Sequence, residues 1–369
     1  MASRLIAYLT PLFFDESSYL GGGERYPLNL ARGVHLATKG DYRIDLISFG
    51  REEKRFQIAE GVDLHVLPVA HTPRRELDVV SWALPAALAK ADVVHIHQAY
   101  TRCAEMGLLV AKQLRKPVCI TDHGGETSRL GIEIGHLELV DRVIAYSDFG
   151  ASLYKTTRPI EVIKGGVDAE LFQPPKIRPR RDRVLFVGRL LPHKGIDMLI
   201  NAMPPDILLT VCGRPYNPKF FEKLKKLAIG KKVEFVTDGD DKRIKDLYAR
   251  AWATVLPSVY RDSDGNTHTA PELMGFTLLE SMACGTPAIA SRVGAMPEFI
   301  RHGETGFVFD SFDEIPLILR SLIHDPMLVR QMGERGRNVV LEEYDLRVAG
   351  RRMADVYAKL LAEPWRQAA

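Results

Sequence analysis

The stretch Val184-Leu-Phe-Val-Gly188-Arg189-Leu-Leu-Pro-His-Lys194-Gly195 indicates the fold of the second half of the chain. Its first four residues are apolar and predict a short buried strand. Arg189 then stands directly after this strand, and Lys194 stands at the entrance of a helix. A strand, a loop and a helix in this order form the repeating unit of a parallel sheet that helices cover on both faces.

The same alternation of short apolar runs and amphipathic stretches continues in both directions, which predicts an α/β fold. In the first half we expect strands at residues 5–9, 44–48, 64–69, 93–97, 118–121 and 143–147. In the second half we expect them at residues 184–187, 207–211, 233–236, 253–256, 288–290 and 307–309. Two successive Rossmann-like domains follow from these two series.

A segment rich in prolines and basic residues, at positions 172–183, separates the two series of strands and is the expected domain boundary. A chain of 369 residues also exceeds what one hydrophobic core usually serves. We therefore expect an N-terminal domain at residues 1–173 and a C-terminal domain at residues 174–343. A long helix is expected within residues 344–369.

The composition narrows the class of protein. The net charge of +3 gives no general attraction to nucleic acid, so we expect no nucleic-acid partner. The four cysteines lack the spacing of a metal site and are interpreted as reduced thiols. Because the sequence contains neither an apolar secretory segment nor a run of about 18 apolar residues, we expect a cytoplasmic protein.

The stretch from Glu272 to Cys284 places two carboxylates, Glu272 and Glu280, eight positions apart around a glycine-containing turn. A carboxylate accepts paired hydrogen bonds from a sugar diol, and Gly275 lets the backbone approach a ligand. The alternative is purely structural: Thr277 caps a helix, Glu280 completes a capping box, and Glu272 is a solvated loop residue.

The cations Arg189 and Lys194 lie where an open parallel sheet binds its ligands, beyond the carboxyl end of a strand. Arginine offers a rigid fork to phosphate oxygens and lysine a movable point charge, so the two together can neutralise a diphosphate without a metal ion. The alternative is a pair of surface cations near a helix N-terminus, where the helix dipole disfavours a lysine.

The loops of the first half contain two further candidate ligand sites. Gly21-Gly22-Gly23 precedes a helix and would let backbone amides meet a phosphate or a sugar, the alternative being a turn without a ligand. The third glycine of the dinucleotide fingerprint is missing, which disfavours a dehydrogenase. His123 precedes two glycines at an expected open rim, whereas His95 and His97 point to one side of their strand and are interpreted as core histidines.

These elements resemble those of one family. Residues 272–280 resemble the E-x7-E signature of retaining GT-B glycosyltransferases of the group 1 or family 4 type, and residues 188–195 resemble their G-R-L-x-x-x-K-G element. The glycine loop and the T-x-H-G context of His123 also match. The family pattern differs at Met274, where phenylalanine is usual, and at Phe276, where leucine is common. The resemblance implies two Rossmann-like domains that face each other across a cleft, with a C-terminal helix that crosses back to the first domain.

The resemblance also implies a reaction. A hexosyl group would pass from a nucleoside-diphosphate sugar to an acceptor hydroxyl with retention, without a cofactor or a metal ion. Arg189 and Lys194 would hold the diphosphate and His123 would contact the sugar that is transferred. Glu272 would hold that sugar and Glu280 the ribose hydroxyls. The other expected donor-binding residues are Gly22, Gly23, Gly188, Gly275, Phe276, Thr277 and Leu278.

Several alternatives stay open. A UDP-sugar is favoured as the donor over GDP-mannose, and the acceptor is a sugar, a lipid-linked molecule or another small molecule. An epimerase, a hydrolase or a noncatalytic sensor of nucleotide sugars would share the same fold. Basic residues at positions 112, 115 and 116, with those at 155 and 158, could meet anionic lipid in a weak peripheral contact, although charged helix faces are usually just solvated.

The segment from Tyr260 to His268 is longer than usual and contains the D-x-D pair Asp262 and Asp264. Such a pair can hold Mg²⁺ or Mn²⁺. The glycine stands at the fourth rather than the sixth position, which excludes an EF-hand. We expect a flexible polar loop over the cleft.

Overall fold

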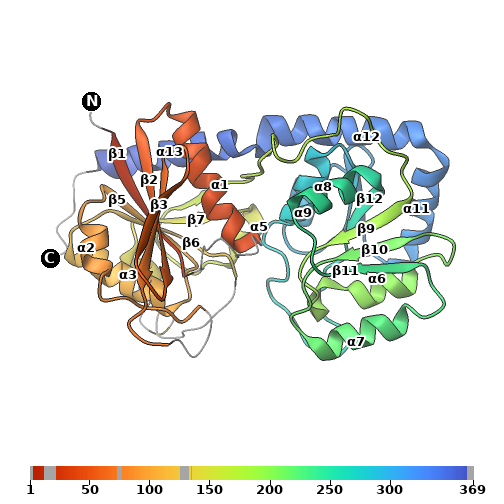
Figure 1. Cartoon of the computed structure of the whole chain (residues 1–369), viewed down its shortest axis with the longest axis horizontal. Coiled ribbons are helices and arrows are strands. Elements are labelled where there is room, and N and C mark those ends of the chain that lie inside the picture. The colour runs from red at the N-terminus through yellow and green to blue at the C-terminus, as the bar shows by residue number, and fades with distance from the viewer. Residues whose placement is uncertain (1–2, 12–21, 73–76, 125–132, 134, 364–369) are drawn as a thin grey trace. The chain divides into compact units, whose positions relative to one another are not determined.

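The computed structural model describes residues 3–11, 22–72, 77–124, 133 and 135–363 (Figure 1). The chain forms two compact units. The first contains Met1–Gly166 and Leu346–Ala369, and the second contains Val167–Asp345. The unit boundaries thus lie at 166/167 and 345/346, whereas the sequence predicted domain boundaries at 173/174 and 343/344.

The first unit is built on an eight-stranded sheet with the order β3-β4-β2-β1-β5-β6-β7-β8. Its strands are β1 (Arg4–Leu9), β2 (Tyr42–Gly50), β3 (Lys54–Ala59), β4 (Val62–Pro68), β5 (Val93–His97), β6 (Val118–Thr121), β7 (Arg142–Ala145) and β8 (Ile160–Val162). All neighbouring strands pair in parallel except β3 and β4, which are antiparallel. Every residue of β5 and β6 is buried, as expected for strands covered on both faces.

The helices of this unit are α1 (Gly22–Ala37), α2 (Leu84–Ala89), α3 (Arg102–Gln113), η1 (His136–Leu139), α5 (Asp148–Leu153) and α13 (Leu346–Ala362). The C-terminal helix α13 packs against α1, which confirms the predicted return of the chain (Figure 1). The two helix backbones touch at Gly33 and Gly350. A Cβ atom at Gly33 would lie 2.0 Å from the carbonyl oxygen of Leu346, so only glycine permits this approach.

The second unit is built on a six-stranded parallel sheet with the order β11-β10-β9-β12-β13-β14. Its strands are β9 (Arg183–Val187), β10 (Leu209–Cys212), β11 (Val233–Val236), β12 (Ala251–Leu256), β13 (Ala288–Ser291) and β14 (Gly306–Phe309). The order reverses at β9, because the chain adds β10 and β11 on one side of that strand and β12 to β14 on the other. Such a reversal is the usual ligand-binding position of a doubly wound sheet.

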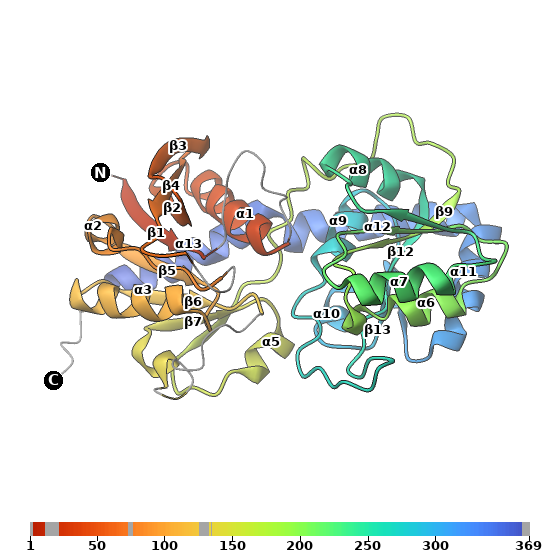
Figure 2. The ribbon, with the colours of Figure 1, turned by 60° about the horizontal axis from the view of Figure 1, so that its bottom comes forward.

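Helices cover both faces of the second sheet. Figure 2 shows α6 and α7 on one face and α8 and α9 on the other. The helical segments of this unit are η2 (Pro192–Lys194), α6 (Ile196–Ala202), α7 (Pro218–Leu227), α8 (Asp241–Arg250), α9 (Phe276–Ala283), α10 (Met296–Phe299), η3 (Phe312–Glu314), α11 (Ile315–His324), α12 (Pro326–Val339) and the π-helical turn η4 (Val340–Tyr344). The α/β fold predicted from the alternation of apolar and amphipathic segments is therefore confirmed.

All twelve predicted strands have a counterpart, but the sequence reasoning missed β3 and β8. The residues from Lys54 to Gln57 in β3 are exposed, because this strand pairs only with β4 at the edge of the sheet. A strand that buries no face carries no apolar run. The other missed strand, β8, has only three residues and is half-buried throughout.

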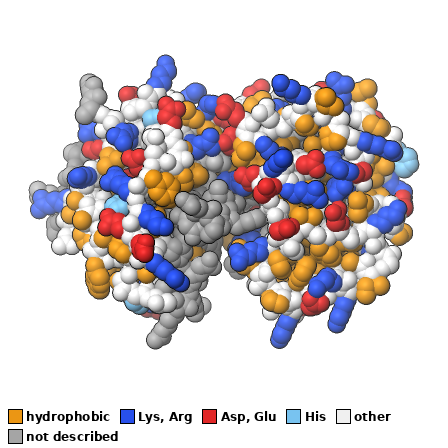
Figure 3. Space-filling view, in the orientation of Figure 1, with side chains coloured by type: hydrophobic (Ala, Val, Ile, Leu, Met, Phe, Trp, Pro, Cys, Tyr) orange, Lys and Arg blue, Asp and Glu red, His pale blue; other side chains and the backbone are white. Residues whose placement is uncertain are grey.

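The distribution of surface charge and the state of the cysteines agree with what the composition predicts. Figure 3 shows positive and negative side chains interspersed over the visible face, with no continuous basic surface there. All four cysteines are buried and unpaired, and burial raises the pKa of the Cys284 thiol to about 12. Within the part of the chain that the structure describes, no helix is both long enough and apolar enough to cross a membrane.

Candidate functional site

Three polar side chains meet beyond the carboxyl ends of β9 and β12 in the second unit. Lys194 Nζ donates a hydrogen bond to Glu272 Oε2 at 2.5 Å, and Ser258 Oγ donates to the same oxygen at 3.1 Å. The side chains of Lys194 and Glu272 are only 11% and 12% exposed. An ion pair that is this buried is costly to desolvate unless further hydrogen bonds support it. Glu272 is therefore not a solvated loop residue, and that alternative is wrong.

The short turn before α9 depends on Gly275. This residue has φ 82°, a conformation that glycine adopts without strain, and it stands at the N-cap of α9 without any side-chain cap. Thr277 lies inside the helix, so the capping box with Glu280 is not formed. The capping interpretation of this stretch is wrong, because α9 begins through the backbone conformation of a glycine.

Glu280 is instead held by a tyrosine of a neighbouring helix. The Tyr248 hydroxyl of α8 lies 3.1 Å from Glu280 Oε2 and 3.1 Å from the carbonyl oxygen of Thr277. Burial, followed by the nearby Glu280 charge, raises the pKa of Tyr248 well above its ordinary value. The hydroxyl therefore stays protonated and can donate to the carboxylate. Glu280 itself is 5% exposed, on the inner side of α9.

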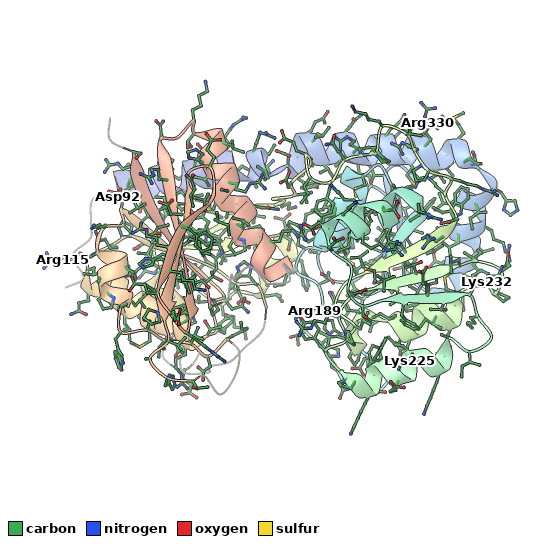
Figure 4. All side chains as sticks on the ribbon, in the orientation of Figure 1. Asp92, Arg115, Arg189, Lys225, Lys232 and Arg330 are labelled. Atoms are coloured by element: carbon green, nitrogen blue, oxygen red, sulfur yellow. The ribbon has the colours of Figure 1, made fainter. Side chains whose placement is uncertain are left out.

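Arg189 lies in the loop that follows β9 (Figure 4). Its side chain is exposed, and among the described residues no hydrogen bond or ion pair holds it. Thus the structure brings Lys194 and Glu272 into direct contact. Arg189 has no hydrogen bond or ion pair to either of them among the described residues, and Glu280 is bonded to Tyr248. Phe276 and Thr277 are half-buried at the start of α9, Leu278 is buried in the same helix, and Gly188 directly follows β9. A helix start of this kind presents backbone N–H groups, which favour an anion.

His193, which precedes Lys194, is a site neighbour that the sequence did not single out. Burial, and then the charge of Lys194, lowers the pKa of His193 to about 4. The imidazole is consequently neutral near pH 7 and adds no charge beside Lys194. The sequence assigned no role to Ser258 or Tyr248, because their roles depend on contacts with residues distant in the sequence.

The loop from Tyr260 to His268 is polar, as predicted, but its backbone is organised around one buried carboxylate. Asp262 accepts hydrogen bonds from the backbone amides of Asp264 at 3.0 Å and Asn266 at 2.9 Å, and His268 Nε2 lies 2.9 Å from it. Burial raises the pKa of Asp262, but the hydrogen bonds from His268 and Asn266 outweigh burial and bring it to about 2. The ionised carboxylate thus fixes the shape of this loop, which the sequence reasoning expected to be flexible.

Lys223 of α7 attaches the same loop to its surroundings, since Lys223 Nζ donates to Asp264 Oδ1 at 2.9 Å and lies 3.3 Å from Asp197 Oδ2. Over the described ranges, no group of three or more His, Cys, Asp and Glu side chains is arranged to hold a metal ion.

In the first unit, the predicted site residues lie at the start of α1 and after β6. Gly22 and Gly23 form the first turn of α1, whereas Gly21 lies outside the described residues. His123 follows β6 and is half-buried. His123 Nε2 lies 3.0 Å from His97 Nδ1 and 3.5 Å from the Tyr146 hydroxyl. Burial lowers the pKa of His123 to about 3, so this imidazole is neutral near pH 7.

The histidines of β5 differ from one another. His95 bonds through both ring nitrogens, with Tyr357 Oη at 2.7 Å and Thr121 Oγ1 at 2.7 Å, so its interpretation as a core histidine is confirmed. His97 is equally buried, but only its Nδ1 is bonded, and no described residue pairs with its Nε2. The pairing of His97 with His123 could not be read from the sequence, because it joins two strands.

Comparison with solved structures shows the fold. The sucrose-phosphate synthase of Thermosynechococcus elongatus superposes with a TM-score of 0.75 at 21% identity, covering 98% of this chain and 100% of that one. The HepE protein of Anabaena, solved with UDP and glucose, superposes with a TM-score of 0.75 at 18% identity, covering 96% and 100%. Two Rossmann-like units with a C-terminal helix that returns to the first define the GT-B fold of glycosyltransferases.

The sequence comparisons then give the family. Residues 20–171 match the family described as Glycosyltransferase Family 4, and residues 167–339 match the one described as Glycosyl transferases group 1. The chain belongs to these group 1, family 4 glycosyltransferases.

Two of its relatives come from Mycolicibacterium smegmatis. A GDP-mannose-dependent alpha-(1-6)-phosphatidylinositol monomannoside mannosyltransferase is 31% identical over 56% of this chain and 58% of its own length. An alpha-maltose-1-phosphate synthase is 29% identical over 74% of this chain and 80% of its own length. The match therefore spans less than two thirds of the first relative.

Proposed function

We propose that the protein transfers a hexosyl group from a nucleoside-diphosphate sugar to an acceptor hydroxyl, with retention of the anomeric configuration. The observation that carries the proposal is the buried contact of Lys194 with Glu272, supported by Ser258 at the carboxyl ends of the strands. A buried ion pair of this kind is weak evidence for stability, since a well-packed apolar pair is often as stable. A role in binding a charged donor explains why the pair is present.

Lys194 is suited to connect the leaving diphosphate with the sugar. An ammonium group has three N–H donors, and one of them bonds to Glu272. The other two are available to phosphate oxygens. Arg189, which no described residue engages, adds a fork of N–H donors to the same anion. As negative charge develops on the departing diphosphate, both cations stabilise the transition state more than the bound donor.

The two glutamates take different parts of the donor in this proposal. Lys194 and Ser258 bond to Glu272 Oε2, so Glu272 Oε1 is left to accept hydrogen bonds from hydroxyls of the transferred sugar. Glu280, which Tyr248 holds on α9, accepts hydrogen bonds from the ribose. We assign the backbone at Gly188 and at Gly275 to Leu278 to the diphosphate, together with Gly22 and Gly23.

Retention needs no protein nucleophile in this mechanism. The acceptor hydroxyl approaches the face of the sugar that the diphosphate leaves, and a leaving phosphate oxygen takes the acceptor proton. The bond from the anomeric carbon to the phosphate oxygen breaks while the bond to the acceptor oxygen forms. His123 contacts the transferred sugar. Because Arg189 and Lys194 supply the positive charge, we propose that the reaction requires no metal ion.

The donor is proposed to be a UDP-sugar, with GDP-mannose as the alternative. The HepE structures with UDP and the name of the mannosyltransferase relative each favour one of these two bases. A thermal-shift series with UDP, GDP and ADP separates them, because a ligand that binds only the folded state raises the unfolding temperature. We expect the largest shift with UDP, and no shift with any of the three would contradict the proposal.

Product analysis tests the reaction itself. The chain is incubated with the nucleotide sugar that gives the largest shift and with a panel of sugar, lipid-linked and small-molecule acceptors, and the products are examined by NMR. A new glycoside with the anomeric configuration of the donor is expected. An inverted product contradicts retention. Free sugar or an epimerised donor formed without an acceptor would indicate a hydrolase or an epimerase, and binding without turnover would indicate a sensor.

A further inference from the structure

Three histidine rings of the first unit lie in a row that begins in the core and ends at His123: His95 and His97 are stacked, whereas His97 and His123 lie edge to edge. His97 lies between the other two rings, with its centroid 4.2 Å from that of His95 and 5.2 Å from that of His123. The planes of His97 and His123 differ by only 12°. His97 Nδ1 lies 3.0 Å from His123 Nε2, which is a hydrogen-bond distance between two ring nitrogens.

One proton must lie between these two nitrogens. Burial keeps both imidazoles neutral near pH 7, since it lowers the pKa of His97 well below 6.5 and that of His123 to about 3. A neutral imidazole carries one proton on one of its two nitrogens. Either His97 donates from Nδ1, which leaves the proton of His123 on Nδ1, or His123 donates from Nε2, which leaves the proton of His97 on Nε2.

The surroundings of His97 distinguish these two arrangements. His97 is 0% exposed, and its Nε2 is buried without a hydrogen-bond partner among the described residues. The second arrangement would bury an N–H group at that position without an acceptor, which is rare and unfavourable. The first arrangement leaves only a lone pair there.

We propose that His97 is a positioning residue, which donates its Nδ1 proton to His123 and so fixes the tautomer of His123 with the proton on Nδ1. His123 then presents an N–H donor and recognises an oxygen acceptor, namely a hydroxyl oxygen of the transferred sugar. The recognition step rests on the proposed function, but the tautomer of His123 does not. The partner of a histidine often selects its tautomer in this way.

A second set of hydrogen bonds holds the inner end of the row. The Tyr357 hydroxyl of α13 donates to the Tyr8 hydroxyl of β1 at 2.7 Å and lies 2.7 Å from His95 Nδ1. The other nitrogen of His95 lies 2.7 Å from Thr121 Oγ1. The C-terminal helix thereby fixes the ring on which His97 stacks, so the orientation of His97 follows from the packing of α13 against the first sheet.

The direct test reads the tautomer of His123 in the unliganded protein. Nitrogen NMR of the full chain labelled with ¹⁵N-histidine distinguishes a protonated ring nitrogen from a bare one, and the His123→Gln variant identifies the His123 signals. We expect a protonated Nδ1 and a bare Nε2 in His123. A protonated Nε2 in His123 would overturn the proposal whether or not the protein transfers sugars.

Two variants at position 97 test its consequence for function. Phenylalanine keeps the ring without a donor, whereas asparagine places an amide N–H near the position of Nδ1. We expect His97→Phe to release the tautomer of His123 and to lower kcat by about tenfold to a hundredfold, as when the outer partner of a functional histidine is removed. His97→Asn should restore the tautomer and most of the turnover. The KM for the donor should change less than kcat.

His65→Phe is the matched control, because His65 is also a buried histidine of the first sheet but bonds to Glu53 instead. This variant should keep both the tautomer of His123 and the turnover, even if its unfolding temperature falls. A folded His97→Phe protein with the wild-type tautomer would contradict the proposal. If that variant does not fold, the wild-type spectrum and the His97→Asn protein decide. Should the tautomer be as expected while no donor is turned over, the proposed function fails and the positioning by His97 stands.

Discussion

Both units place polar side chains near the carboxyl ends of their parallel strands, but the groups differ: imidazoles at β5 and β6 in the first unit, and a buried ion pair in the second. In the first unit, His95, His97 and His123 are neutral imidazoles in contact with tyrosines. In the second unit, Lys194 and Glu272 form an ion pair. Neutral donors and acceptors suit the recognition of hydroxyl groups, whereas a buried ammonium suits an anion. Under the proposed function, the imidazole of His123 would therefore meet hydroxyl oxygens of the sugar, and Lys194 would meet the diphosphate.

The largest effect on turnover is expected for Lys194→Ala, which removes the cation of the ion pair with Glu272. Loss of one preorganised charge-stabilising group lowers kcat by about a hundredfold to a thousandfold. The variant also leaves Glu272 buried without its cation, which should lower the free energy of unfolding by about 3–5 kcal/mol. Release of nucleoside diphosphate at saturating donor and a urea titration measure the two effects.

The matched control for this prediction is Lys225→Ala on α7 (Figure 4), where the lysine pairs with Glu222 one turn away and lies over the Phe221 ring. Turnover and stability should stay close to those of the wild type, because exposed ion pairs contribute little. Near-normal turnover of a folded Lys194→Ala protein would remove Lys194 from the diphosphate site.

Arg189→Ala should separate function from stability. Arg189 is exposed and no described residue engages it, so its loss should change the free energy of unfolding by less than about 0.5 kcal/mol. As a cation on the leaving diphosphate, however, its loss should lower kcat by about a hundredfold. Arg330→Ala, at an exposed arginine of α12, is the control. A variant that loses stability but keeps its turnover would show that Arg189 has a structural role instead.

Glu280→Gln tests the proposed contact of the second unit with the ribose of the nucleotide. The amide keeps the size of the side chain but removes the charge that the ribose hydroxyls would donate to. A hydrogen bond to a charged group contributes about 1.5–3 kcal/mol, so the Kd for the nucleoside diphosphate should rise about tenfold to a hundredfold. Calorimetric titration measures this change, with Glu304→Gln in an exposed turn as the control. An unchanged Kd would leave Glu280 with Tyr248 as a purely structural pair.

The neutral histidines His95 and His123 should make the free energy of unfolding depend on pH. Burial lowers the pKa of both His95 and His123 to about 3, compared with about 6.5 when unfolded, so the unfolded state binds more protons between these values. The free energy of unfolding should therefore be fully retained above pH 6.5 and fall by about 1.4 kcal/mol per histidine for each pH unit below it. Urea titrations from pH 7.5 to 4.5 measure the slope. A His95→Phe protein should show a shallower slope, and an identical slope would contradict neutral burial of His95.

The sequence predicted most of the fold and the chemical types of the site, because strands covered on both faces are apolar runs and their carboxyl-end loops carry the polar residues. It could not predict what joins distant strands. Ser258 supports Glu272, Tyr248 holds Glu280, and His97 meets His123, and each contact depends on the order of strands in the sheet. The alternative of a capping box was wrong for a different reason. The left-handed backbone of Gly275 starts α9 two residues before Thr277, so Thr277 is not at the cap position.

A crystal structure of the chain with bound UDP is the most direct test of the claim that the second unit binds the diphosphate of a nucleotide sugar. We expect the β-phosphate to lie within hydrogen-bond distance of both Arg189 and Lys194, and the ribose hydroxyls to donate to Glu280. A nucleotide bound elsewhere, or bound with Arg189 and Lys194 directed away from its phosphates, would contradict the account.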